Sequence, residues 1–364
     1  MAHIILIAST DLVSDQRVHR SSLTLHQEGH KVLTIGRRLA DTPRSIERKY
    51  KVKLFRMFFR KGFLFYFFFN VRIFFYLLLH KFDLVCSNDL DSLLGCRLGC
   101  FFRGKPLVYD SHEYYTEVPE LIGRPITKGI WKIIERCCIK GLKYSSTVSE
   151  GIANEYFKKY GIKMEVIRNL PFRNENFGHK SVRPTIIYQG VLNEGRGLEL
   201  AIEMIHNLPC YYLMIVGSGE LELKLRKRVI ELNIVDRVEF RGRLPYEKLH
   251  ALTSKAWLGI SLEEDLGLNY RYALPNKLFD YIQAQIAVLV SDLPEMSKVV
   301  EKYDIGIVAK TRNPKELANV VAEFFENKVN REKMLNNISL AYNELVWENE
   351  KPKFLELYKR ALAN

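Results

Sequence analysis

Three polar residues near the start of one amphipathic segment could hold a phosphorylated ligand. Asn276 and Lys277 follow Pro275, and proline is tolerated in the first turn of a helix because its missing N–H would have no partner there anyway. The free N–H groups and the positive end of such a helix can bind a phosphate, and Asp280, one turn further on, could reach a sugar hydroxyl beside it. The same pattern also fits a helix that packs beside the strand-like run 287–292, so the rest of the chain must decide.

Two glycine-bearing turns each follow a predicted strand and could lie against a phosphate. The first reads GVLNEGRGLE from Gly190 to Glu199 and contains Arg196, whose guanidinium can pair with a phosphate through two hydrogen bonds. The second reads VGSGE and contains Gly217. Neither turn has the G-x-G-x-x-G spacing of a dinucleotide site, so they do not indicate an NAD enzyme.

Polar residues also follow the predicted strands of the first half. Asp89 and Asp91 form a D-x-D pair, which holds a metal-bound diphosphate in some sugar transferases, but this spacing is common by chance and we predict no metal site. His112, next to Glu113 at a strand end, could polarise or orient a reacting sugar. It could equally cap its own loop.

The elements that must position these residues alternate between short apolar runs and helical patterns. This alternation predicts parallel sheets covered on both faces, which bind ligands at the carboxyl ends of their strands. The stretch 169–184 is rich in proline, asparagine and charge and has no period, so it is interpreted as an interdomain linker, after which the pattern restarts. A chain of 364 residues can build two cores. We therefore expect an α/β fold of two Rossmann-like, doubly wound domains facing a cleft.

The formal net charge of +13 is concentrated in one block. Between Lys31 and Gly62 there are eleven Lys and Arg against Asp41 and Glu47, a local balance of +9. Such a block predicts an anionic partner or a solvated surface. A nucleic acid is one such partner, but single-strand binders space their aromatics as stacking platforms, whereas the aromatics here form one continuous run. We therefore expect no nucleic acid.

The aromatic run 63–79 approaches the length that spans a bilayer, but Asn70 and Arg72 interrupt its centre, and it lies between two predicted strands of one sheet. The pattern favours a helix at the membrane interface, with residues 51–82 contacting an anionic surface. A very aromatic helix buried against the sheet is the alternative. The six cysteines lack metal-binding spacing and the N-terminus lacks a basic leader, so we expect reduced thiols and a cytoplasmic protein at the inner face of the membrane.

Several segments together resemble those of the family-4 glycosyltransferases, and they cover nearly the whole chain in the family's order. They are YDSHE (109–113), TVSEGI (147–152), VIRNLP (166–171), YQGVLNEGRGLE (188–199), VGSGE (216–220), VEFRGRL (238–244), PNKLFDY (275–281), SDLPE (291–295) and the terminal VWENE…LELYKRAL from residue 346.

The resemblance implies a GT-B fold whose last helix crosses back to the first domain. Accordingly, we expect an acceptor-side domain over 1–172 that includes 345–364, a linker over about 173–182 and a nucleotide-sugar domain over 183–344. Members of the family typically transfer a sugar with retention of configuration and need no metal or other cofactor.

The resemblance also implies roles by position. Arg196 holds the diphosphate, Asp280 stands where a Glu usually binds the ribose, and His112 contacts the transferred sugar. The residues implied in catalysis are His112, Arg196 and Lys277. Those implied in donor binding are Gly190, Arg196, Gly217, Arg243, Leu244, Asn276, Lys277, Asp280 and Glu264, with Arg243 and Leu244 bordering the base. Those implied on the acceptor side are Asp15, Arg17, Asp89 and Glu113.

The chain departs from the family pattern at three places. Val191 replaces a basic residue of the glycine loop, and Tyr272 stands where the first of two paired acids is usual, so that Glu263 or Glu264 would have to substitute. The usual glycine loop after the first strand is replaced by STDLVSDQR, which contains Asp15 and Arg17.

These observations predict a retaining glycosyltransferase that moves a sugar from a nucleoside-diphosphate sugar to a lipid-linked or cell-surface polysaccharide acceptor. A basic nucleic-acid-binding protein, a nucleotide-sugar epimerase and a non-catalytic GT-B relative are the alternatives.

Overall fold

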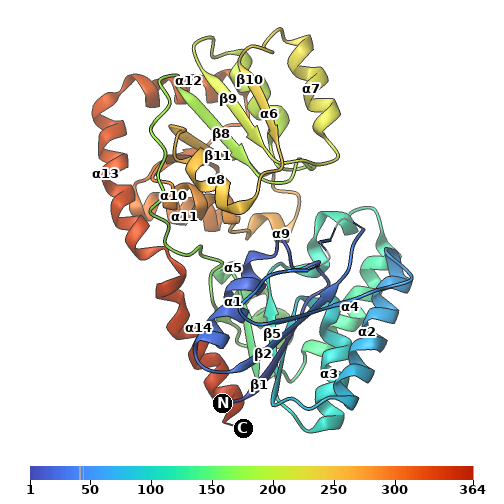
Figure 1. Cartoon of the computed structure of the whole chain (residues 1–364). Helices are drawn as coiled ribbons and strands as arrows, with labels where there is room; N and C mark the ends of the chain where they lie inside the picture. Colours follow the sequence, from blue (N-terminus) through green and yellow to red (C-terminus); the bar gives the residue numbers. More distant parts are fainter. Residues whose placement is uncertain (41, 44, 364) are drawn as a thin grey trace. The chain divides into compact units, whose positions relative to one another are not determined.

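The chain forms two compact units (Figure 1). The computed structural model describes residues 1–40, 42–43 and 45–363, with their side chains except those of residues 120, 246 and 247. Two charged residues of the basic block, Asp41 and Arg44, lie outside the described residues. The first unit comprises Met1–Arg168 and Glu350–Asn364, and the second Asn169–Asn349.

The stretch expected to be a linker, 173–182, lies in the second unit. Its Gly178 N–H donates to Ser254 Oγ at 2.6 Å, and its Ser181 N–H donates to the Lys255 carbonyl at 2.8 Å. These bonds hold the segment against the end of α8 (Tyr246–Thr253) and the turn that follows it.

The first unit is built on a parallel sheet of seven strands in the order β3-β2-β1-β4-β5-β6-β7. The strands are β1 (His3–Ile7), β2 (Lys31–Arg37), β3 (Lys51–Phe55), β4 (Leu84–Asn88), β5 (Leu107–Ser111), β6 (Tyr144–Thr147) and β7 (Glu165–Val166). The sequence did not predict β3, which lies inside the basic block. The helices are α1 (Gln16–Gln27), α2 (Gly62–Leu79), α3 (Leu93–Arg103), α4 (Pro125–Ile139), α5 (Glu150–Tyr160) and most of α14 (Trp347–Leu362), with short 3-10 turns at Leu90–Ser92, Tyr115–Glu117 and Pro119–Leu121.

Helix α2 joins β3 to β4 and turns one narrow stripe to the sheet. Phe65, Phe69, Ile73 and Leu77 are buried at four-residue intervals, whereas the large side chains between them are half-buried or exposed. By length and composition alone α2 could cross a membrane, although core helices pass the same test. The strands before and after α2 belong to the same sheet, as expected.

Asn70 interrupts the apolar run of α2 because it joins neighbouring elements. Its Oδ1 accepts the N–H of Gly95 at 2.8 Å, and its Nδ2 donates to the carbonyl of Asp91 at 2.7 Å. A Cβ at Gly95 would lie 2.5 Å from the Asn70 carbonyl oxygen, so the glycine lets α3 approach α2 closely. Arg72, the other interruption, lies over the Phe55 ring at 4.3 Å and donates to the carbonyl of Arg56.

The second unit has a parallel sheet of six strands in the order β10-β9-β8-β11-β12-β13. The strands are β8 (Thr185–Gln189), β9 (Tyr212–Val216), β10 (Val238–Gly242), β11 (Leu258–Ser261), β12 (Ala287–Ser291) and β13 (Gly306–Ala309). Its other helices are α6 (Leu198–His206), α7 (Glu222–Glu231), α9 (Leu268–Arg271), α10 (Asn276–Gln283), α11 (Pro294–Tyr303), α12 (Pro314–Glu326) and α13 (Lys328–Glu344).

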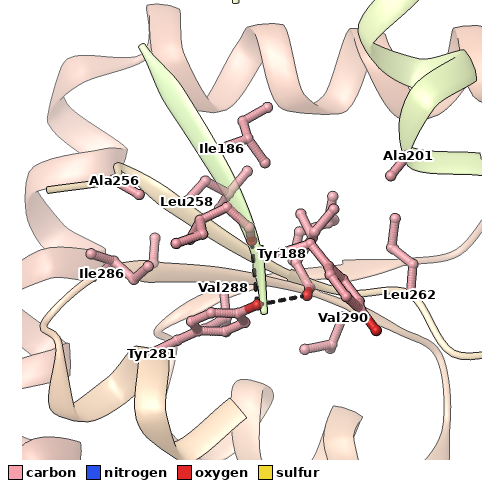
Figure 2. Packing of buried hydrophobic residues seen from close by; sticks show 14 of the residues in the cluster. Ile186, Tyr188, Ala201, Ala256, Leu258, Leu262, Tyr281, Ile286, Val288 and Val290 are labelled. Atoms are coloured by element: carbon pink, nitrogen blue, oxygen red, sulfur yellow. Dashed lines mark hydrogen bonds between the residues drawn. The ribbon is translucent and has the colours of Figure 1, made fainter. Parts of the chain in front are cut away.

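Tyr281 attaches α10 to this sheet (Figure 2). Its hydroxyl accepts the N–H of Gln189 at 3.1 Å and donates to the carbonyl of Ile260 at 3.1 Å, bridging β8 and β11. The ring lies against Gly259, where a Cβ would come within 2.4 Å of it. The helix that carries Asn276, Lys277 and Asp280 is therefore fixed at the carboxyl ends of the central strands.

Candidate active site

A fully buried carboxylate, Glu263, lies beside two cations just after β11. Its Oε1 is 2.9 Å from Lys277 Nζ and 3.9 Å from Arg196 Nη1, and its Oε2 accepts the Ser261 hydroxyl at 2.7 Å. Burial opposes ionisation, but Lys277 and the Ser261 hydroxyl outweigh it, so the pKa of Glu263 is lowered. Among these three side chains one negative charge thus faces two positive charges, an arrangement that suits an anionic ligand.

Aromatic rings hold both cations of the cluster. Lys277 Nζ lies 4.1 Å from the centre of the Tyr188 ring, and the Arg196 guanidinium lies 5.2 Å from that of Tyr270. Tyr188 comes from β8 and Tyr270 from α9. The sequence did not indicate either ring, because a tyrosine in a buried strand or helix reads as a core residue. Only the fold shows that a cation lies against it.

The two predicted glycine turns pack directly on each other. Gly217 has φ +146°, and a Cβ there would lie 1.8 Å from the carbonyl oxygen of Gly190. Gly190, with φ +142°, lies close to Lys277, since its own Cβ would be 3.5 Å from Lys277 Cε. The structure therefore brings the turns and the start of α10 together, which the sequence could only suggest.

Asp280 lies one turn along α10 and accepts a hydrogen bond from Gln189 Nε2 at 2.9 Å. Gln189 is oriented in turn by the Thr253 hydroxyl, which donates to its Oε1 at 2.7 Å. These residues line a small pocket together with His250. Asn276, exposed at the start of α10, accepts a hydrogen bond from Asn169 Nδ2 at 2.6 Å.

Of the two acids that could substitute for the one missing at Tyr272, the structure brings Glu263 to the cluster. Glu264, the residue named for donor binding, instead lies 3.4 Å from Arg312 and donates its N–H to the carbonyl of Gly195. Arg312, which sequence reasoning missed, also donates to the Leu262 carbonyl and so holds this loop.

Arg243 and Leu244, expected to border the base, directly follow β10 in the second unit. Arg243 is exposed and Leu244 is half-buried. Their side chains therefore stand at the carboxyl end of the edge strand of that sheet.

In the first unit, His112 is held between two carboxylates. Its Nε2 is 3.2 Å from Asp110 Oδ2 and its Nδ1 is 3.4 Å from Asp89 Oδ2. Burial lowers the pKa of His112, but the two carboxylates raise it further, and the net effect is a pKa of about 9. His112 is therefore an imidazolium at neutral pH, with a carboxylate at each ring nitrogen.

Asp89 has an unusual backbone conformation, with φ 61° and ψ 168°. Few residues other than glycine adopt this region, and the cost is about 1–3 kcal/mol. The conformation lets Asp89 Oδ1 accept the N–H of His112 at 2.8 Å while Oδ2 faces the ring. The strained residue, Asp89, is therefore the one that positions His112.

Arg17 and Asp15, named as acceptor contacts, already have partners within the first unit. Arg17 is 4% exposed, donates to both oxygens of Asp110 at 2.8 and 2.6 Å and donates to the carbonyl of Ile167 at 2.9 Å. Asp15 caps α1 by accepting the N–H of Val18. A direct acceptor contact by Arg17 would require its buried guanidinium to leave these partners.

Glu113 and Asp91, which also follow strands of the first sheet, differ in their exposure to solvent. Glu113 is exposed, whereas Asp91 is 6% exposed and accepts a hydrogen bond from the Ser9 hydroxyl. Burial raises the pKa of both Asp89 and Asp91 to about 6. Among the residues that the structure describes, no group of three or more His, Cys, Asp or Glu is placed so that it could hold a metal ion.

Two parallel, helix-covered sheets in successive units define the GT-B glycosyltransferase fold. Similarity to known families supports this assignment. The model of Glycosyltransferase Family 4 matches residues 16–170, and that of Glycosyl transferases group 1 matches residues 172–340. The chain belongs to the family-4 glycosyltransferases, and it is a glycosyltransferase of the group 1 superfamily. No curated protein matches its sequence.

Solved structures share this fold over the whole chain. A sucrose-phosphate synthase from Thermosynechococcus elongatus has 16% sequence identity and a TM-score of 0.83, with 100% of both chains covered. Anabaena Alr3699/HepE, determined with UDP-glucose, has 13% identity and a TM-score of 0.78 over 99% of this chain and 100% of that one. WaaG, a glycosyltransferase involved in lipopolysaccharide biosynthesis, has 14% identity and a TM-score of 0.76 over 96% and 98%. At these identities the similarity shows the fold.

Proposed function

We propose that the protein is a retaining glycosyltransferase that uses a nucleoside-diphosphate sugar and acts on a lipid-linked or cell-surface polysaccharide acceptor. The observation that carries this proposal is the cluster of Lys277, Arg196 and Glu263 beside the packed glycine turns. An excess of positive charge next to a helix start and two glycine turns suits a diphosphate. The structure of Alr3699/HepE in complex with UDP-glucose supports a donor of this class.

In the proposed reaction, the bond between the sugar and the diphosphate breaks as the acceptor hydroxyl attacks from the same face. Negative charge grows on the leaving diphosphate, and Arg196, Lys277 and the start of α10 stabilise it. Glu263 accepts a hydrogen bond from Lys277 and so orients its side chain. Asp280, already hydrogen bonded to Gln189, accepts from a ribose hydroxyl.

His112 is proposed to lie against the transferred sugar as a fixed cation. Because both ring nitrogens face carboxylates, it cannot serve as a general base at neutral pH. The acceptor proton is therefore assigned to the departing diphosphate rather than to this residue.

The charge on Arg196 and Lys277 is proposed to replace that of a divalent cation, so transfer requires no metal. Transfer assayed with and without a chelator tests this point, and a rate that falls in the chelator and returns with magnesium contradicts it.

We also propose that the enzyme is cytoplasmic and associates peripherally with the inner face of the membrane through residues 51–82. All six cysteines are unpaired thiols, and four of them are buried, which fits a reducing compartment. No nucleic-acid partner is proposed, because the exposed aromatics of α2 are crowded on one helix instead of being spaced along a groove.

A thermal-shift panel of nucleoside diphosphates and nucleotide-sugars tests the proposed donor class. A ligand at ~100 times its dissociation constant adds about 2.7 kcal/mol to the unfolding free energy, which raises the melting temperature measurably. We expect one diphosphate and its sugar conjugates to stabilise the protein, while nucleosides do not. NMR of the product made from a labelled donor then reports the anomeric configuration. An epimerised donor with no transfer would favour the epimerase alternative, and binding of RNA or DNA without any nucleotide-sugar would favour the nucleic-acid one.

A further inference from the structure

Three helices of the first unit each leave an apolar stripe uncovered. Phe67 and Phe75 are 49% and 55% exposed on α2, and Phe101 is 78% exposed at the end of α3. On α4, Ile126 and Ile133 are 80% and 65% exposed and lie two turns apart on one side of the helix. Single exposed apolar residues are ordinary, but a cluster on adjacent elements marks an interaction surface.

The three stripes belong to one surface, because the helices pack side by side. Phe74 of α2 meets Phe102 of α3 with ring centres 5.8 Å apart, and Tyr66 of α2 meets Trp131 of α4 at 5.1 Å. Figure 1 shows α2, α3 and α4 together on one side of the first sheet. We call the exposed side of these three helices the apolar face.

The apolar face carries positive charge without exposed negative charge. All residues of α2, α3 and α4 are described, and their one acidic residue is Glu135, which is fully buried and bonded to Lys159 and Tyr160. Exposed cations stand at its borders, among them Arg72, Arg103 and Arg136. Two further cations of α4, Lys128 and Lys132, pair with Glu117 from the turn before the helix. A surface that combines exposed aromatics with an excess of cations is complementary to anionic headgroups over an acyl layer.

The helix α7 of the second unit shows what an ordinary solvated helix of this protein looks like. It also exposes an apolar residue, Leu223, at 83%. However, its acids neutralise its cations, with Arg226 2.8 Å from Glu222 and Arg228 3.1 Å from Glu231. The helices of the apolar face carry no exposed acid of their own to neutralise their cations, and this distinguishes the face from α7.

We propose that the apolar face of α2, α3 and α4 docks on a bilayer that carries anionic headgroups. Phe67, Phe101 and Ile126 enter the boundary between headgroups and acyl chains, while the bordering guanidinium groups contact lipid phosphates. The inference deepens the membrane association proposed above for residues 51–82, adding α3 and α4, and it does not depend on the sugar-transfer chemistry. Helix α2 lies along the bilayer instead of crossing it, because Phe65, Phe69, Ile73 and Leu77 remain on the sheet.

Co-sedimentation of the full chain with vesicles, without any nucleotide, tests the proposal. One vesicle is phosphatidylcholine alone, and the other contains equal parts phosphatidylcholine and phosphatidylglycerol. We expect binding to the anionic vesicle at least about tenfold stronger, and weakened by added salt.

Substitutions test each helix separately. Phe67→Glu, Phe101→Glu and Ile126→Glu should each reduce binding to the anionic vesicle by about tenfold or more, since each places a carboxylate at the interface. Leu223→Glu on α7 is the matched control and should bind like the wild type. Circular dichroism and melting temperature check that all four variants fold.

Three results overturn the proposal or part of it, and a fourth separates it from the proposed reaction. Equal binding to both vesicles would show that the apolar face does not recognise anionic headgroups. Normal binding by Ile126→Glu or Phe101→Glu removes α4 or α3 from the docking surface. If the wild-type protein binds no vesicle and forms dimers that Phe101→Glu dissociates, the apolar face binds a second copy of the chain instead. Vesicle binding that persists in a protein without transfer activity leaves this inference intact and counts against the proposed reaction instead.

Discussion

The charged centres of the two units differ in how completely their charges are balanced. In the first unit, Asp110 and Asp89 face Arg17 and His112, so two negative charges meet two positive ones and each ring nitrogen of His112 has a carboxylate. In the second unit, Glu263 faces both Lys277 and Arg196. A balanced cluster stabilises its fold, whereas a cluster with surplus positive charge can bind a further anion. This difference supports the proposal that a diphosphate binds to the second unit.

Removing one carboxylate from each centre tests whether the two centres differ in this way. Asp110→Asn leaves a buried guanidinium and an imidazolium without their shared partner, so we expect the unfolding free energy to fall by about 3–5 kcal/mol. Glu263→Gln leaves Lys277 and Arg196 on their aromatic rings beside the proposed anion site, and should cost about 1–2 kcal/mol. Urea denaturation of both variants measures the difference. Equal losses would show that the second centre is as structural as the first.

Removing a cation from the second centre tests the proposed part of that centre in sugar transfer. Arg196→Ala should lower kcat/KM for transfer by about 10²–10³-fold, since it removes charge that stabilises the departing diphosphate. The melting temperature should change little. Arg226→Ala on α7, which breaks an exposed ion pair, is the matched control and should retain activity. Near-normal turnover by Arg196→Ala would refute its assigned role.

The pH dependence of stability should report the balanced centre. The pKa of His112 is raised from 6.5 to about 9 in the folded protein, so its stabilising contribution is complete below pH ~6.5 and is lost as pH rises through about 9. The contribution should be on the order of 2–3 kcal/mol. Denaturation between pH 7 and 10 measures it, and His112→Asn should flatten the profile in that range. A wild-type profile as flat as that of the variant would mean that His112 is neutral.

Much of the scaffold follows from local patterns, because buried parallel strands appear as short apolar runs. The strand-like runs at β1, β8 and β12, and the helix of PNKLFDY, are confirmed. Strand β3 was missed because Lys51 and Lys53 alternate with Val52 and Leu54 inside a block dominated by charge. An edge strand with one polar side carries this weaker signal.

The site was only partly predictable, since its partners meet through the fold. Arg17 and Asp110 are 93 residues apart in sequence, and nothing near either one predicts their pairing. Glu263 and Glu264 are adjacent, yet backbone direction sends one to Lys277 and the other toward Arg312. By contrast, the helix start that carries Lys277 could be predicted, because its proline and its amphipathic pattern are local signals.

The return of the chain to the first unit has a consequence for the order of folding. Glu350, 1% exposed, accepts from the Nε of Arg168, and Tyr358 lies buried near Cys86 and Asp110. During synthesis, residues 1–168 therefore leave the ribosome long before the segment that completes their core. The second unit is contiguous from 169 to 349 and can finish first, so we expect this protein to reverse the usual order in which the N-terminal domain matures before its neighbour.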